Sequence, residues 1–291
     1  MLGAIIGDTV GSVYEFHNIK TTDFPLFSER SRPTDDSIMS MAVAEWLLSD
    51  PERTQAKLEE CMVQWGERYP HVGYGTTFRH WLFNPEFLAR YKEKEDGEED
   101  GLRHPYNSWG NGSAMRCSAC GWVAQSLKEA LESAKRSAEI THNHPEGIKG
   151  AQATAAAIFM ARNEASKEEI REYITKTFHY DLTKTCDDIR PTYTFDVSCQ
   201  GTMPAALAAF FDSHDFESAI RLAVSLGGDS DTIACITGGI AEAYYWDIPK
   251  TIIRKMREIL PEDWWKIMED VIELSDFADT CRKMEFKCIF G

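Results

Sequence analysis

The sequence predicts an all-α protein, a compact multi-helix fold in which residues 1–291 form a single domain. Apolar residues recur at helical spacing along most of the chain, which indicates roughly ten helices or more packed in layers. Segments with the alternating pattern of strands are scarce, and a single such segment cannot make a sheet. Apolar residues make up 43% of the 291 residues, so the chain can bury a large core, and this composition excludes intrinsic disorder.

The first predicted helix lies at the N-terminus and has a face of small residues. Gly3, Gly7 and Gly11 follow one another at intervals of four, and such a face lets a second helix approach closely. Asp8 is a polar residue on this otherwise apolar helix. Because the segment has no basic start and is interrupted by Asp8, we do not expect a signal peptide. No apolar run in the sequence approaches the ~20 residues that span a bilayer.

Later segments repeat the helical spacing. Alanine-rich faces at 153–157 and 205–209 predict two closely packed helices. Residues 190–199 are expected to form an extended connection, and the charged segment 92–101, KEKEDGEEDG, a solvated and mobile loop. Four further helices are indicated by apolar positions at Leu127, Leu131, Ala134 and Ala138; at Phe216, Ile220, Ala223 and Val224; at Ile253, Met256 and Leu260, before Pro261; and at Ile267, Val271 and Leu274.

Charge and cysteine usage limit the function classes. The chain has 31 Lys and Arg against 47 Asp and Glu, a formal net charge of −16. This acidity argues against a nucleic-acid contact surface or an anionic membrane as partner. Cys117 and Cys120 form the one C-x-x-C among eight cysteines, inside a predicted helix, where core packing is favoured over a metal or redox role. We expect a cytoplasmic protein without disulfides.

Two short motifs place acidic and hydroxyl side chains at helix starts. Residues 33–37, PTDDS, precede an apolar run, and residues 227–232, GGDSDT, precede another. Each motif by itself is explained by helix capping. Together they supply four carboxylates and two threonine hydroxyls, more than two caps need. These hard oxygen ligands suit Mg²⁺ or Mn²⁺ and make a poor zinc site, so a two-metal centre is predicted if both motifs face one cavity.

Three other stretches are candidates for ligand contacts. Glu15 lies near the end of the first helix, where a solvated side chain is the alternative. Residues 108–116, SWGNGSAMR, allow an unusual backbone whose free N–H groups can hold a phosphate, and a plain turn capped by Ser113 is the alternative. His142, in THNHP, is a candidate substrate hydrogen-bonder or a polar residue in a turn between helices.

These stretches, in this order, resemble the ADP-ribosylglycohydrolase family, which includes ADP-ribosylarginine and ADP-ribosylserine hydrolases and dinitrogenase reductase-activating glycohydrolases. The resemblance runs from Gly3-Ala-Ile-Ile-Gly-Asp8 to the sequence GGDSDTIACITGGIAEAYY, which ends at Tyr245. It implies an all-α fold with a cleft that holds two Mg²⁺ or Mn²⁺ ions. It also implies an enzyme that hydrolyses the C1″ glycosidic bond of ADP-ribosyl groups on protein side chains or small conjugates and releases ADP-ribose.

The resemblance also assigns roles to individual residues. Glu15, with Asp36 or Asp229 in reserve, is expected to accept a proton from the attacking water. The implied metal ligands are Thr34, Asp35, Asp36, Asp229, Asp231 and Thr232. The implied substrate contacts are Gly110, Asn111, Gly112 and Ser113 for the diphosphate, His142 near the distal ribose, and Gly201 in a loop of the same cleft.

Two other functions remain open at this point. A non-catalytic ADP-ribose-binding or structural protein on the same fold is one, and another metal-dependent hydrolase is the other. All six implied metal ligands are present, which favours the active enzyme. The sequence does not identify the acceptor linkage or the ring that stacks on the adenine, and family habit favours a monomer.

Overall fold

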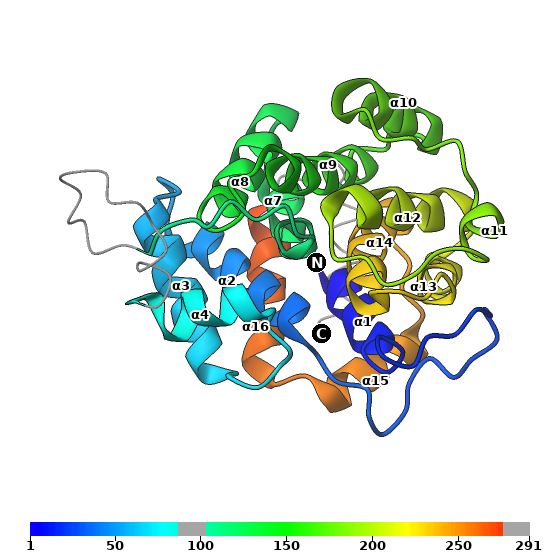
Figure 1. Ribbon diagram of the computed structural model, residues 1–291, viewed down its shortest axis with the longest axis horizontal. Coiled ribbons are helices and arrows are strands. Elements are labelled where there is room, and N and C mark those ends of the chain that lie inside the picture. Colours follow the sequence, from blue (N-terminus) through cyan, green and yellow to red (C-terminus); the bar gives the residue numbers. More distant parts are fainter. Residues whose placement is uncertain (87–102, 276–291) are drawn as a thin grey trace.

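The computed structural model describes residues 1–86 and 103–275, and within these ranges the protein is built from helices (Figure 1). The all-α prediction is confirmed. In the described ranges, β-structure is limited to an isolated bridge between Gly110 and Ser198. Of the segment 190–199, predicted as an extended connection, residues 193–198 form the connection, whereas residues 190–192 form a turn and Cys199 begins the next helix. The acidic segment 92–101 lies outside the described residues. The helices are α1 (Leu2–Gly11), α2 (Asp35–Ser49), α3 (Gln55–Arg68), α4 (Thr76–Phe83), α6 (Gly112–Met115), α7 (Ser118–Val123), α8 (Leu127–Glu139), α9 (Pro145–Arg162), α10 (Lys167–Phe178), α11 (Cys186–Ile189), α12 (Cys199–Asp212), α13 (Phe216–Ser225), α14 (Ser230–Tyr245), α15 (Lys250–Ile259) and α16 (Glu262–Leu274).

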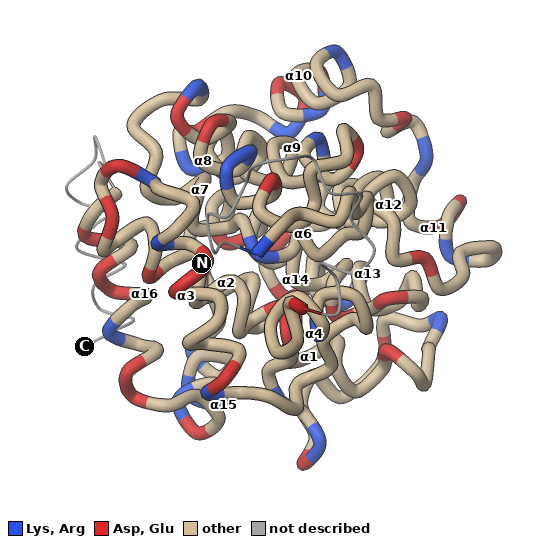
Figure 2. The backbone as a smooth tube through the Cα atoms, turned by 60° about the vertical axis from the view of Figure 1, so that its left-hand side comes forward, with Lys and Arg blue, Asp and Glu red and all other residues tan. Residues whose placement is uncertain are grey.

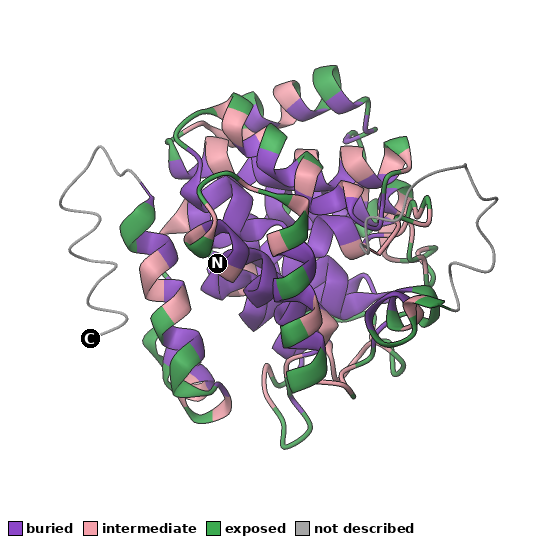
Figure 3. Cartoon of the chain, turned by 90° about the vertical axis from the view of Figure 1, so that its left-hand side faces the viewer, coloured by how far each residue is buried: buried purple, intermediate pink, exposed green. Residues whose placement is uncertain are grey.

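The helix α14 is the centre of the fold. It is buried along nearly its whole length and packs against α1, α9, α12 and α13. Figure 1 shows α2, α3 and α4 on one side of the pair formed by α1 and α14, and α10 to α13 on the other. Burial follows the same plan, since α1 and α14 are buried on nearly all faces and outer helices such as α8 only on the face turned inward (Figure 3).

The contact between α1 and α14 depends on the glycines that the sequence places at intervals of four. A β-carbon on Gly7 would lie 1.9 Å from the carbonyl oxygen of Ala234, and one on Gly3 would lie 2.3 Å from that of Gly238. Only glycine permits this approach, because any side chain there would push the two helices apart. The predicted small face is therefore the surface on which α14 packs. The first turn of α1 is capped by Glu242 of α14, which accepts hydrogen bonds from Leu2 N and Gly3 N.

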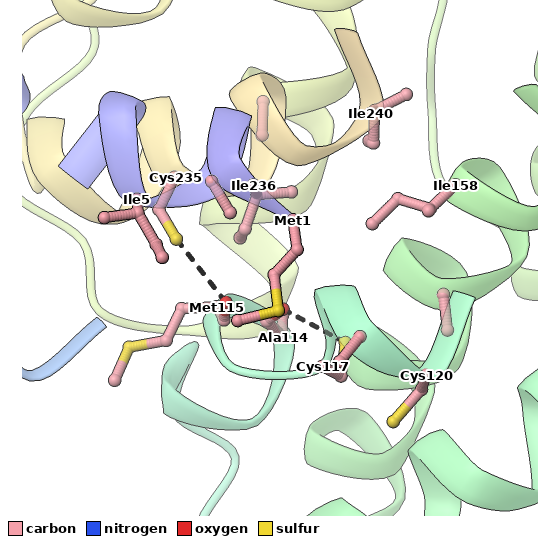
Figure 4. Packing of buried hydrophobic residues seen from close by; sticks show 14 of the residues in the cluster. Met1, Ile5, Ala114, Met115, Cys117, Cys120, Ile158, Cys235, Ile236 and Ile240 are labelled. Carbon is pink, nitrogen blue, oxygen red and sulfur yellow. Dashed lines mark hydrogen bonds between the residues drawn. The ribbon is translucent and has the colours of Figure 1, made fainter. Parts of the chain in front are cut away.

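The apolar core surrounds this helix pair. Met1, which precedes α1, and Ile5 of α1 pack near Ile236 and Ile240 of α14 (Figure 4). Cys117 and Cys120 are buried in the same core, and Cys117 Sγ contacts the carbonyl oxygens of Ala114 and Ala151. Burial raises the pKa of both thiols, Cys120 to about 12, which disfavours the reactive thiolate. The C-x-x-C therefore has the core role that was favoured.

Charged residues lie mainly on the outer helices and loops, where acidic and basic side chains are interspersed (Figure 2). Several form ion pairs at helical spacing, such as Lys176 with Glu172 and Lys266 with Asp270. Exposed pairs of this kind contribute little to stability, about 0–1 kcal/mol each. In residues 1–86 and 103–275, none of the helices combines the length and the hydropathy needed to cross a membrane.

Candidate functional site

A cavity of about 550 Å³ opens where the first turns of α2 and α14 meet the loop before α6. The two acidic motifs, about 190 residues apart in the sequence, thus face the same space, as the two-metal hypothesis requires. Five acidic side chains line the cavity, and among the described residues that line it Arg116 is the only Lys or Arg. The acidic members are Glu15, Asp35, Asp36, Asp229 and Asp231, and further lining residues include Phe78, Tyr106, Trp109, Gly110, Asn111, Gly112, Met115, His142, Phe195, Val197 and Thr232.

Asp8 holds the first motif in place. Thr34 is the N-cap residue of α2, but its side chain does not cap the helix. Instead, Asp8 of α1 accepts hydrogen bonds from Thr34 N (2.8 Å) and Ser37 N (3.1 Å), the amide groups that a capping side chain ordinarily satisfies. The hydroxyls of Thr34 and Ser37 also donate to Asp8, which is fully buried. The polar residue on the apolar helix therefore has a defined partner.

The second motif begins in a turn of two glycines. Gly227 and Gly228 have φ angles of +72° and +70°, a region that favours glycine, and they turn the chain into α14. Asp229 is the N-cap residue of that helix and accepts a hydrogen bond from Asn111 Nδ2 at 2.6 Å. Thr232 Oγ1 donates to Asp36 Oδ2 at 3.3 Å, which links the second motif directly to the first.

The carboxylates form two groups that share one member. Oxygens of Asp8, Asp36 and Asp231 lie within 4.8 Å of one another, and so do oxygens of Glu15, Asp229 and Asp231. Burial, and then the negative charge of the neighbouring carboxylates, raises the pKa of Asp36 and of Asp231 well above the ordinary value. So many acidic groups cannot all ionise at neutral pH unless positive charge enters the site.

The donor set fits hard divalent cations. The buried oxygen Asp36 Oδ1 has no hydrogen-bond partner among the described residues, and such an atom calls for a ligand. Carboxylate and hydroxyl oxygens are the donors that Mg²⁺ and Mn²⁺ prefer, and neither group of carboxylates includes a cysteine or histidine. Asp35 also lines the cavity but belongs to neither group; burial, followed by the charge of Asp8, raises its pKa to about 8.

Glu15 lies in the connection after α1 and points into the cavity. It is half-buried, so the solvated side chain considered as the alternative is not what the structure has. Burial raises its pKa to about 7, the charge of Asp229 adds to the shift, and a hydrogen bond with Asp231 opposes it. A carboxyl group with a pKa near neutrality, next to the acidic groups, can exchange protons at physiological pH.

The glycine-rich loop lies on the opposite wall. Gly110, Asn111 and Gly112 line the cavity, whereas Ser113 is fully buried and donates to the carbonyl oxygen of Gly147 at 2.7 Å. The N-cap residue of α6 is Asn111 and not Ser113, so the turn is not capped by the serine that the alternative named. Asn111 N donates a hydrogen bond to the carbonyl oxygen of Val197 at 2.7 Å, and this bond connects the loop to the extended connection.

His142 borders the same loop. Its ring lies beside Gly110 and Gly112, where a β-carbon on Gly112 would come within 3.1 Å of Nε2. Nδ1 is 2.7 Å from the hydroxyl of Thr141, which also accepts a hydrogen bond from Arg116. Burial and the adjacent guanidinium hold the pKa of His142 well below its usual range. The ring is therefore neutral, with Nε2 toward the glycines.

The structure adds two residues to the site that the sequence did not assign to it. It also places one of the predicted site residues outside the cavity lining. Gly201 is not among the residues that line the cavity; it lies in the first turn of α12, where its missing side chain makes room for Asp196. Asp8 joins the acidic groups, and its signal in the sequence was its polarity on an apolar helix. Trp109 lines the cavity with 48% of its surface exposed, and residue type alone did not identify it.

Comparison with known proteins gives consistent matches. The family model described as ADP-ribosylglycohydrolase matches residues 1–283. The chain is 28% identical to ADP-ribosylarginine hydrolase Tri1 of Pseudomonas putida (strain GB-1), over 84% of this chain and 69% of the relative. It is 24% identical to ADP-ribosylhydrolase ARH3 of Homo sapiens, over 98% of this chain and 92% of the relative. A solved structure described as an ADP-ribosylglycohydrolase-related protein complex has a TM-score of 0.71 at 24% identity, covers 94% of this chain and 96% of its own, and shows the same fold.

Proposed function

Because the chain belongs to the ADP-ribosylglycohydrolase family, we propose that it is a metal-dependent enzyme that releases ADP-ribose from modified protein side chains or small conjugates. The bond cleaved joins C1″ of the distal ribose to the acceptor atom. The observation that carries the metal dependence is the convergence of two acidic groups on one cavity, with Asp231 in both. Two cations, Mg²⁺ or Mn²⁺, are the cofactors of this proposal.

The residues that would hold the cations are those of the two motifs. Asp36 offers a buried oxygen with no other partner among the described residues, and Asp229 and Asp231 offer carboxylates at the start of α14. Thr34, Asp35 and Thr232 complete the proposed set, and Asp8 orients the first motif through Thr34 and Ser37. When bound, the cations supply positive charge that orients the ribose hydroxyls and makes a nearby water easier to deprotonate.

Glu15 is the proposed base. Water attacks C1″ as the bond to the acceptor atom breaks, and the proton of that water passes to the Glu15 carboxylate. The transition state resembles an oxocarbenium ion, as in glycoside hydrolysis generally. A base works best with a pKa near the operating pH, and the pKa of Glu15 is raised to about 7 by burial and by Asp229. The departing acceptor atom takes up a proton from solvent.

The opposite wall suits the rest of ADP-ribose. The amide groups of Gly110 and Asn111 are occupied by Ser108 Oγ and Val197 O, and Ser113 is fully buried and not among the lining residues, so the amide of Gly112 is the candidate for the diphosphate. His142 Nε2, beside Gly112, is a candidate hydrogen-bond partner of the ribose or diphosphate. The exposed ring of Trp109 offers a flat face for the adenine, whose stacking partner the sequence alone did not reveal.

The charge of the cavity explains why cations belong to this proposal. A diphosphate is anionic, while the cavity has five acidic side chains, and Arg116 is committed to Ser137 O at 2.6 Å and Thr141 Oγ1 at 2.9 Å. Bound cations reverse the local field and remove this conflict. As parts of the same proposal, the enzyme acts as one domain, as a monomer, and in the cytoplasm, where free cysteines persist.

The test is release of ADP-ribose from two defined peptides, one modified on arginine and one on serine, with Mg²⁺ and again with EDTA. Release from one peptide that EDTA abolishes supports the enzyme and identifies the linkage. Binding of ADP-ribose without release from either peptide favours the non-catalytic reader. If ADP-ribose is neither released nor bound, the result favours another metal-dependent hydrolase on this fold.

Asp229→Ala provides the control within the protein. The variant is expected to lose turnover and keep the helical circular dichroism spectrum of the unmodified protein, because the Asp229 side chain lines the cavity and makes no capping hydrogen bond to α14. Full activity of Asp229→Ala with an unchanged metal requirement contradicts the assignment of the second motif.

A further inference from the structure

The connection after α1 has to fix Glu15 without the help of a helix. Helix α1 ends at Gly11, and Tyr14 N bonds back to Gly11 O at 2.8 Å in a turn. Residues 12–23, here called the Glu15 segment, then run over the surface in turns and extended backbone. A catalytic group on such a segment keeps a defined position only if other contacts restrain its backbone.

Asn18 supplies that restraint with one side chain. Its Nδ2 donates to the carbonyl oxygens of Tyr14 and Glu15, both at 2.8 Å, and to Gly228 O at 2.9 Å. Its Oδ1 accepts from Gly228 N at 2.7 Å. The side-chain amide therefore pairs with the backbone of Gly228 in both directions, as one peptide group pairs with another, while it binds the peptide of Glu15 itself.

The glycine turn leaves room for Asn18, because a β-carbon on Gly227 would lie 3.3 Å from Asn18 Oδ1. Gly228 has a φ of +70°, and a β-carbon there would lie 2.6 Å from the ring of Tyr193. The bonded residue directly precedes Asp229 and lies three positions before Asp231. Through Asn18, the peptide of Glu15 is thus joined to the backbone that carries two of the proposed metal ligands.

Further contacts of the Glu15 segment are made by Phe16 and Lys20, which follow Glu15, and do not include Glu15 itself. Lys20 Nζ donates to Tyr193 O at 2.7 Å and to Leu226 O at 2.5 Å. The rings of Phe16 and Phe195 stack with their centroids 6.1 Å apart. These contacts keep the segment against its neighbours, so its attachment does not depend on Asn18 alone, whereas the Glu15 carbonyl oxygen accepts its hydrogen bond from Asn18.

We propose that Asn18 is a positioning residue for Glu15, which holds the Glu15 carboxyl group at a fixed place relative to Asp229 and Asp231. The proposal rests on the proposed function in one respect, the role of Glu15 as the base. It predicts that loss of the Asn18 amide lowers the rate of the chemical step and leaves substrate binding and stability nearly unchanged, because Asn18 is exposed and does not line the cavity.

The experiment is a double-mutant cycle in the full-length, Mg²⁺-loaded protein with the peptide that the wild type cleaves. Asn18→Ala is expected to lower kcat by about tenfold, with KM changed by less than about twofold, since a small misplacement of a catalytic group costs rate. In the Glu15→Gln background the same substitution is expected to cause no further loss, because two residues that act as a unit are not additive. Asn18→Asp keeps the acceptor for Gly228 N but loses the donors, and it is expected to behave like Asn18→Ala.

Asn163→Ala is the matched control. Asn163 is also an exposed asparagine whose Nδ2 donates to a backbone carbonyl, Phe159 O at 2.7 Å, but it lies at the end of α9 away from the cavity. Its kcat and KM are expected to equal those of the wild type. Hydrogen exchange of the 13–18 amides, measured without substrate, is expected to accelerate in Asn18→Ala and to stay unchanged in Asn163→Ala.

Three results overturn the proposal: an unchanged kcat in Asn18→Ala or Asn18→Asp, an equal loss of kcat in both backgrounds, or unchanged exchange of the 13–18 amides. A wild-type rate in Glu15→Gln contradicts the proposed base instead. In that case the exchange measurement alone decides whether Asn18 restrains the segment.

Discussion

At the scale of single residues, the site is defined by crowded acidic groups. Asp231 belongs to both groups of carboxylates, and burial with its acidic neighbours raises its pKa well above the ordinary value. We expect a residue in this position to destabilise the protein when no cation is present and to bind the cation when one is. The same side chain is thus expected to have opposite effects on stability in the two states.

Asp231→Asn tests this opposition. In EDTA the variant is expected to unfold at a higher temperature than the wild type, because an amide does not bear the free-energy cost of burying an ionisable carboxyl group whose pKa is raised on folding. Added Mg²⁺ is expected to raise the unfolding temperature of the wild type and not of the variant, since a ligand stabilises only the state that binds it. Differential scanning calorimetry measures both effects.

Asp187→Asn is the control for that experiment. Asp187 is an exposed aspartate that pairs with Arg190 on α11, and its loss is expected to leave the Mg²⁺ response intact. An Mg²⁺ response in Asp231→Asn as large as that of the wild type contradicts the assignment of Asp231 as a ligand.

Trp109 supports a prediction on substrate affinity. Its ring lines the cavity and is half-exposed, so it has an open face for a base. Stacking of a base on an aromatic side chain contributes about 1–3 kcal/mol, so Trp109→Ala is expected to weaken ADP-ribose binding by about tenfold or more. Isothermal titration calorimetry gives the affinity. Trp109→Phe, which keeps a ring, is expected to retain most of it, and equal affinity of Trp109→Ala and the wild type excludes Trp109 as the stacking residue.

At the scale of elements, the pairing of α1 with α14 builds the site. Asp8 on α1 and Asp231 on α14 belong to one acidic group because the two helix axes approach as closely as glycine allows. Gly11 lies against Asp231 itself, with its virtual β-carbon 2.5 Å from Asp231 Cα. The spacing between the helices therefore sets the distance between Asp8, which orients the first motif, and Asp231, a proposed metal ligand.

Gly7→Ala is expected to destabilise the protein and impair the site together. The new β-carbon would lie 1.9 Å from Ala234 O, a backbone atom that cannot move without α14. Overpacking of this kind costs about 1–3 kcal/mol and at times more. Urea unfolding reports the loss, and kcat is expected to fall as Asp8 and Asp231 separate.

Gly239→Ala provides the comparison on the same helix pair. Its β-carbon would make ordinary contacts, the nearest at 3.4 Å with Ile158. We expect a free energy of unfolding equal to or above that of the wild type, because alanine is the better helix former. If both glycine variants unfold at the same urea concentration, the close approach at Gly7 is not what the α1–α14 contact requires.

At the scale of the whole molecule, the acidity is distributed unequally. The net charge of −16 is spread over the surface together with basic residues, but the cavity concentrates carboxylates with Arg116 as the one lining cation among the described residues. The surface charge opposes association with polyanions, and the proposed cations are expected to bind in the cavity, where the carboxylates are concentrated. Stability, metal binding and pH are coupled through this cavity.

This coupling gives a pH dependence with a defined sign. The pKa of Asp35 is raised from 3.8 to about 8 and that of Glu15 from 4.5 to about 7, in both cases first by burial. Between pH 4 and 8 the folded state therefore binds more protons than the unfolded state, and stability is lost as the pH rises. In EDTA, the unfolding temperature is expected to fall from pH 5 to pH 8, and added Mg²⁺ is expected to raise it more at pH 8 than at pH 5 because protons compete for the ligands.

The double variant Asp35→Asn and Glu15→Gln is the control for the pH series. Without the two titrating groups, the decline in unfolding temperature between pH 5 and pH 8 is expected to become shallower. A metal-free wild type whose unfolding temperature stays level or rises across this range contradicts the raised pKa values.

The sequence by itself determined the helical class and much of the chemistry of the site. Helical periodicity and capping are local properties, so α8, α13, α15 and α16 follow the predicted positions, and Pro261 ends the helical pattern where expected. The two acidic motifs were recognisable because carboxylates and hydroxyls at two helix starts exceed what capping needs. Their assignment to metals stays a prediction, as do the contacts of Gly110, Asn111, Gly112, Ser113, His142 and Gly201 with substrate.

Only the tertiary structure decided which distant residues meet. Asp8 caps α2 across 26 positions, Asn18 pairs with Gly228 across 210, and Asn111 reaches Asp229 across 118. The tertiary structure also buries the Ser113 side chain in the protein interior, and it places Gly201 outside the cavity lining. The physical reason is that the role of a side chain depends on its burial and on its contact partners, both of which are created by helix packing. The spacing of residues along one segment does not determine its burial or its partners.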